Sequence, residues 1–79
     1  MRNIVDTINQ ILAIVPTTRV TYNLIQDLTR IRDRASFMPP EISYKAWEEL
    51  HEKVVETFKP EEFQLADWEL EVINILTGN

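Results

Sequence analysis

The sequence predicts an all-α fold, a compact antiparallel bundle of four short helices in a single domain spanning residues 1–79. Apolar residues recur at helical spacing in four segments, and prolines at positions 16, 39, 40 and 60 separate these segments. Glycine occurs only once, as Gly78, whereas tight β-hairpins depend on glycine. The predicted helices cover about residues 3–15, 18–35, 41–58 and 60–77.

The first two segments each carry one apolar stripe. The stripe of segment 3–15 contains Ile4, Ile8, Ile11, Leu12 and Val15. Pro16 ends this helix, because the residue before a proline avoids the α region. Thr17 or Thr18 is expected to cap the next helix, since a threonine hydroxyl accepts a hydrogen bond from a free amide of the first turn. The buried stripe of that helix is predicted to contain Val20, Leu24, Leu28, Ile31 and Ala35.

The third predicted helix has an apolar face and an acidic face. It follows a linker at 36–40, whose Phe37 and Met38 predict that the linker packs on the core. The apolar face contains Trp47, Leu50, Val54 and Phe58. The acidic face contains Glu48, Glu49, Glu52 and Glu56. Such a face is usually solvated, and it also suits the docking of a basic partner.

The fourth predicted helix carries two apolar stripes on nearly opposite sides. It begins at Pro60, has Glu61 and Glu62 in its first turn, and stops at the C-cap Gly78. One stripe contains Phe63, Ala66, Leu70 and Ile73. The other contains Leu65, Trp68, Val72, Ile75 and Leu76. A helix that is apolar almost all round should be buried almost all round.

Two interpretations of these stripes remain open. The last helix is the centre of the bundle, or part of its second stripe is exposed as a dimer seam or a partner groove. The exposed residues would then be Leu65, Trp68, Val72 and Ile75.

Length and composition favour a role in binding. A domain of 79 residues usually needs a further stabilising element (a staple), such as a disulfide, a bound metal or another protein chain. The absence of cysteine excludes disulfides and thiolate metal sites. The staple is then another protein surface, which makes a homodimer one alternative. The net charge of −5 is unevenly distributed: residues 1–38 sum to +2 and residues 39–79 to −7. The two halves are expected to attract each other across the bundle, or to present an acidic end to a basic partner.

Catalytic and metal chemistry have little support in the sequence. His51 is the only histidine, so one chain cannot build a Ser-His-Asp triad or a multi-histidine zinc site. Glu48 and His51 form a single Glu-x-x-His pair, whereas di-iron bundles use two such pairs. We therefore expect no enzyme activity, no cofactor and no metal, and a packed, partly buried His51.

A nucleic-acid face is the alternative to a protein-binding face. Arg19, Arg30 and Arg34 fall on one side of the second predicted helix, where a helix–turn–helix protein would place residues that read DNA. The sequence pI of about 4.7 opposes this interpretation, because the acidic half would repel phosphates. Duplex DNA is thus the less favoured partner.

The sequence predicts a small acidic protein-binding module of the inhibitor or adaptor type, which docks on a larger protein or complex. A phage- or plasmid-encoded inhibitor of a host nucleic-acid-handling machine fits this size and charge. The alternative is a small DNA-binding regulator. No apolar run approaches the roughly 20 residues that span a bilayer, and the N-terminus lacks the pattern of a signal peptide. We therefore expect a cytoplasmic location and no membrane partner.

Overall fold

The structure is a computed structural model that describes residues 3–39, 41, 43–58 and 65–78. It contains four helices, α1 (Ile4–Ile14), α2 (Tyr22–Ala35), α3 (Ser43–Thr57) and α4 (Asp67–Leu76). No strand occurs in the described ranges, so the predicted all-α fold is confirmed. In the same ranges, no helix combines the length and apolarity that crossing a membrane requires.

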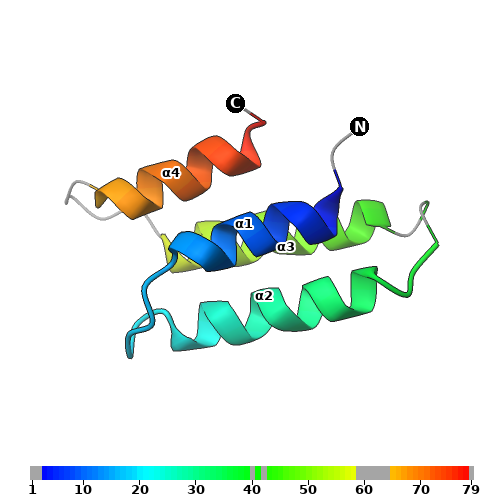
Figure 1. Ribbon diagram of the computed structural model, residues 1–79, viewed down its shortest axis with the longest axis horizontal. Coiled ribbons are helices and arrows are strands. Elements are labelled where there is room, and N and C mark those ends of the chain that lie inside the picture. The colour runs from blue at the N-terminus through cyan, green and yellow to red at the C-terminus, as the bar shows by residue number, and fades with distance from the viewer. Residues whose placement is uncertain (1–2, 40, 42, 59–64, 79) are drawn as a thin grey trace.

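Helix α1 lies at the centre of the packing. It packs against α2, α3 and α4, while α2 also packs against α3. Figure 1 shows α1 between α4 on one side and α2 on the other. The interpretation that the last helix is the bundle centre is therefore wrong, because α4 has α1 as its main neighbour. Three residues flanking the buried stripe of α1 are themselves half-buried, as expected of a helix with neighbours on several sides. These are Val5, Leu12 and Ile14.

Both ends of α1 follow from local chemistry. The side-chain oxygen of Asn3 accepts hydrogen bonds from the backbone amides of Val5, at 2.8 Å, and Asp6, at 3.4 Å, which satisfies two free donors of the first turn. Val15 is extended, as expected for the residue before Pro16. The buried stripe between these ends contains Ile4, Ile8, Ile11 and Val15.

Helix α2 begins at Tyr22, four residues later than predicted. Its N-cap is Thr21, whose side chain makes no capping hydrogen bond, so the predicted cap at Thr17 or Thr18 is wrong. The Thr18 hydroxyl accepts a hydrogen bond from the Thr21 amide at 3.1 Å and thereby stabilises the turn that leads into the helix. Val20 lies in this turn and is 79% exposed. Its predicted place in the core is therefore wrong, because it precedes the helical stripe. The remaining stripe is confirmed, with Leu24, Leu28 and Ile31 buried and Ala35 half-buried.

The linker after α2 packs less completely than predicted. Phe37 is 89% exposed, whereas Met38 is half-buried. The Phe37 amide donates to the Arg34 carbonyl at 3.1 Å, so the chain continues to turn beyond α2. This continued turn carries Phe37 to the side away from the buried stripe. The prediction that Phe37 lies on the core is wrong.

The core-facing side of α3 agrees with the prediction. Leu50, Val54 and Phe58 are buried and Trp47 is half-buried. Ala46 is also buried, which the predicted stripe did not include.

Helix α4 begins at Asp67, and Ala66 before it is extended. Residues 65–66 are therefore not helical as predicted, while the predicted start at Pro60, with Glu61, Glu62 and Phe63, lies outside the described residues. The Glu69 carboxylate accepts a hydrogen bond from the Ala66 amide at 2.8 Å, which satisfies a free donor at this start. At the other end Gly78 has a φ of 83°, the left-handed conformation that favours glycine, and the predicted stop is confirmed.

Candidate functional site

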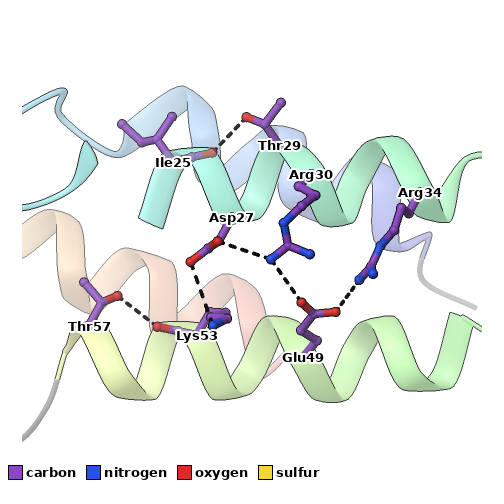
Figure 2. Close-up of polar contacts among 8 residues, drawn as sticks. All are labelled: Ile25, Asp27, Thr29, Arg30, Arg34, Glu49, Lys53 and Thr57. Atoms are coloured by element: carbon purple, nitrogen blue, oxygen red, sulfur yellow. Dashed lines mark hydrogen bonds and ion pairs between the residues drawn. The ribbon is translucent and has the colours of Figure 1, made fainter. Parts of the chain in front are cut away.

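Helices α2 and α3 are joined by a chain of ion pairs (Figure 2). The Arg30 guanidinium donates to Asp27 and to Glu49, at 3.2 Å in each case. Arg34 donates to the other oxygen of Glu49, and Lys53 lies 4.0 Å from Asp27. Hydrogen bonds to Asp27 and then to Glu49 raise the pKa of Arg30 above its ordinary value, because they favour the charged form. The predicted attraction between the basic and acidic halves is thus observed between these two helices.

These ion pairs divide the predicted nucleic-acid face. Arg30 and Arg34 both form ion pairs with Glu49, so this carboxylate partly compensates their positive charge. Arg19 lies in the turn before α2, is exposed, and makes no ion pair within the described part of the chain. The structure does not bring these three arginines together as one unpaired basic surface.

Glu49→Gln is expected to lower the melting temperature by a few degrees at low salt, because it removes the negative charge that accepts from two arginines. Added salt screens exposed ion pairs, so the difference from the wild-type protein should shrink in 1 M NaCl. Thermal unfolding at both salt concentrations measures this effect. Glu52→Gln on the same helix is the matched control, because Glu52 makes no ion pair in the described ranges. Equal shifts for the two variants would contradict a stabilising role of Glu49.

The outer face of α3 presents apolar side chains between carboxylates. We define this outer face as Tyr44, Glu48, His51, Glu52 and Val55. Tyr44, His51 and Val55 follow one another at i, i+7 and i+11, which places them on one side of a helix. Tyr44 is 70% exposed and Val55 is 65% exposed. The core on the opposite side holds Ala46, Leu50 and Val54, which fixes this stripe toward the outside.

The predicted acidic face separates into two parts. Glu49 is directed to α2 and accepts from Arg30 and Arg34. Glu48, Glu52 and Glu56 are exposed, and none of them forms an ion pair within the described residues. Three carboxylates therefore keep their charge available to a partner, and two of them belong to the outer face of α3.

A shallow hollow of about 400 Å³ lies on the outer face of α3. Its walls are Tyr44, Trp47, Glu48, His51 and Glu52. The ring centroids of Trp47 and His51 are 6.3 Å apart and the ring planes are inclined by 48°. His51 is exposed, so the prediction that this side chain is packed and partly buried is wrong. Tyr44 and Val55 were not among the predicted contact residues of this face, which were four glutamates.

The second predicted interface, on α4, is largely taken up by the chain itself. Val72 is fully buried, so the expectation that it is exposed is wrong. Trp68 is half-buried and meets the Phe58 ring edge-on, with centroids 5.4 Å apart and planes at 80°. Leu65 and Ile75 are half-buried against the same core. Whether these three partly covered residues also contact a partner stays a prediction.

The more exposed apolar stripe of α4 is the other one. Leu70 is 48% exposed and Ala66 is exposed, whereas Ile73 is half-buried. A small domain with one central helix leaves part of any second apolar stripe in contact with water. Such isolated exposed side chains are ordinary on protein surfaces and do not define a binding site.

A second hollow, of about 440 Å³, lies between α2 and α3. Its walls include the ion pair between Asp27 and Lys53, so its charges partly compensate each other. Within the described ranges, no three histidine, cysteine, aspartate or glutamate side chains are grouped so as to hold a metal ion. This second hollow also has Glu56, unpaired within the described residues, and the exposed Val20 among its walls, together with the cation Lys53. The outer face of α3 differs from it because, among the described residues, two unpaired carboxylates and three aromatic rings line its hollow and no lysine or arginine does.

Known proteins offer no template for this surface. No protein-family model, no curated protein sequence and no solved structure matches the chain. The functional argument therefore starts from the residues of the outer face of α3 and from their chemistry.

Proposed function

We propose that this chain is a small, acidic, non-catalytic protein-binding module that docks on a basic segment of a larger protein. The outer face of α3 is the proposed contact surface. The observation that carries the proposal is the pair Glu48 and Glu52, exposed and without ion pairs in the described residues, beside the exposed side chains of Tyr44 and Val55.

This combination supports a protein partner over a nucleic acid. The carboxylates repel phosphates and attract lysine and arginine, which steers a basic partner toward this face. Tyr44 and Val55 add apolar area that loses contact with water on docking. A polar rim around apolar and aromatic residues is the usual arrangement of transient protein interfaces.

An inhibitor or adaptor is the class of protein that this module fits best, because such proteins act by covering or bridging surfaces of a larger machine. The rest of the proposal is an antiparallel arrangement of the bundle, a cytoplasmic location and action on a host nucleic-acid-handling complex. Such a complex carries basic surfaces, which suits an acidic docking face. The burial of Val72 favours the outer face of α3 over α4 as the contact surface.

The test compares two charge reversals of equal size. Glu52→Lys alters the outer face of α3, and Glu71→Lys alters an exposed position of α4. A partner isolated with the wild-type chain is purified, and its affinity for both variants is measured by calorimetry at two salt concentrations. We expect Glu52→Lys to weaken binding at least about tenfold and Glu71→Lys to change it less than about threefold. Equal losses for both variants, binding that does not respond to salt, or no partner at all would contradict the proposal.

A further inference from the structure

We propose that the hollow on the outer face of α3 is a binding slot for an arginine side chain of the partner. The slot consists of Tyr44, Trp47, Glu48, His51 and Glu52. This inference rests on the proposed function and names the chemical group that the module recognises.

The slot combines the two features that attract a cation. Glu48 and Glu52 supply two negative charges that no described cation of the chain neutralises. Three aromatic rings line the same hollow: the exposed Tyr44 and His51, and the half-buried Trp47, whose ring centroid lies 6.3 Å from that of His51 with the planes inclined by 48°. A cation held near the face of an aromatic ring is attracted by its quadrupole, most strongly by tryptophan. Two carboxylates and aromatic rings around one hollow therefore favour a positively charged group over a neutral one.

The charges of the chain itself show why the slot is available. Figure 2 shows the guanidinium groups of Arg30 and Arg34 directed to Glu49 on α3, which engages both. Glu49 is also half-buried, whereas Glu48 and Glu52 are exposed. The flank of α3 facing α2 is thus occupied by internal ion pairs, and the outer face keeps its carboxylates for an external cation.

Arginine fits this slot better than lysine. The guanidinium group is planar, so it stacks on an aromatic ring while its edge donates to carboxylates. The ammonium group of lysine is compact and strongly hydrated, and it satisfies only the electrostatic part of the slot. An aromatic wall next to two carboxylates therefore selects for the guanidinium shape. We expect this selection to be about three- to fivefold in affinity, the range typical of exposed cation–π contacts.

The test uses three peptides of identical length and spacing, which carry three arginines, three lysines or three citrullines. Binding is followed by the emission of Trp47 in a Trp68→Phe background, whose folding is checked by circular dichroism, and by calorimetry. We expect the arginine peptide to bind about three- to fivefold more tightly than the lysine peptide, and the citrulline peptide not to bind.

Two matched tyrosine variants locate the effect. Tyr44→Leu removes one of the three aromatic rings of the slot, so it should weaken the preference for arginine over lysine. Tyr22→Leu removes a tyrosine that is also more than half exposed but lies at the start of α2, and it should change neither affinity. Because both side chains are largely exposed, the variants keep the core intact. A Tyr44→Leu variant whose preference for arginine equals that of the wild-type chain overturns the slot.

The failure of the slot differs from the failure of the proposed function. If the arginine and lysine peptides bind the wild-type chain equally and neither binds the double variant Glu48→Gln/Glu52→Gln, the slot is overturned. The docking of a basic partner is then left intact. Binding of either cationic peptide that survives Glu48→Gln/Glu52→Gln overturns both, as does binding of duplex DNA in place of the peptides. Failure of every peptide to bind overturns the slot, while the comparison of Glu52→Lys with Glu71→Lys still decides the proposed function.

Discussion

Replacing Ile11 with alanine is expected to lower the free energy of unfolding by about 2–5 kcal/mol. Ile11 is fully buried on α1, the helix that packs against the other three. Alanine removes buried apolar volume, and the surrounding helices close only part of the space left behind. Small domains have a thin stability margin, so this loss is a large part of the total.

Urea unfolding followed by far-ultraviolet circular dichroism measures the loss, and Ile14→Ala is its matched control. Ile14 is on the same helix, has the same side chain and is only half-buried. Its replacement should cost clearly less, because a smaller apolar area is returned to water. A larger loss for Ile14→Ala than for Ile11→Ala would show that α1 does not occupy the centre of the bundle.

The helical fold was predictable because the core residues repeat with the period of a helix. Leu24, Leu28 and Ile31 occupy successive turns of α2. The prolines between the four segments mark where this helical repeat is interrupted. Helix starts were predicted less well. Val20 and Phe37 have the hydropathy of core residues, yet each lies in a turn next to α2 and is exposed. Hydropathy alone does not show whether a residue precedes or follows the helical stripe.

The choice between the two stripes of α4 was not predictable, because both have helical spacing. Packing against α1 decides it, and this contact buries Val72 and Leu76 while leaving Leu70 half-exposed. The identity of the central helix had a weak signal in α1. Val5 and Leu12 lie beside the main apolar stripe of that helix, and both are half-buried because α1 has several neighbours.

The charges of the candidate site were predictable from the sequence, whereas its hollow was not. The excess of arginine in the first half and of glutamate in the second predicted the pairing of Arg30 and Arg34 with an acid, and Glu49 is that acid. The spacing of Tyr44 and Val55 on the acidic side of α3 was equally present in the sequence. It carried little weight because single exposed apolar residues are common on protein surfaces. The hollow lined by Tyr44, Trp47 and His51 depends on ring orientation, which spacing does not specify.

Introducing aspartate at Val72 is expected to detach α4 from the rest of the bundle. Val72 is fully buried, and a buried charge without a partner costs more than about 3 kcal/mol in most proteins. Separating α4 from α1 exposes the carboxylate to water and avoids this cost. Amide hydrogen exchange should therefore accelerate throughout α4 well before α2 and α3 lose protection. The emission of Trp68 should shift to longer wavelength in a Trp47→Phe background, because its contact with Phe58 is lost.

Leu70→Asp is the matched control, since it introduces the same charge two residues away on the same helix. Leu70 is nearly half exposed, so its replacement should cost less than about 1 kcal/mol and leave the exchange of α4 unchanged. The comparison also decides between the two candidate interfaces of the molecule. If Leu70→Asp detached α4 and Val72→Asp did not, the stripe with Trp68 and Val72 would face outward, and a partner groove on α4 would again compete with the outer face of α3. If Val72→Asp alone has the large effect, the stripe of α4 that contains Val72 packs on the core. Recognition is then left to the carboxylates and aromatic rings of α3.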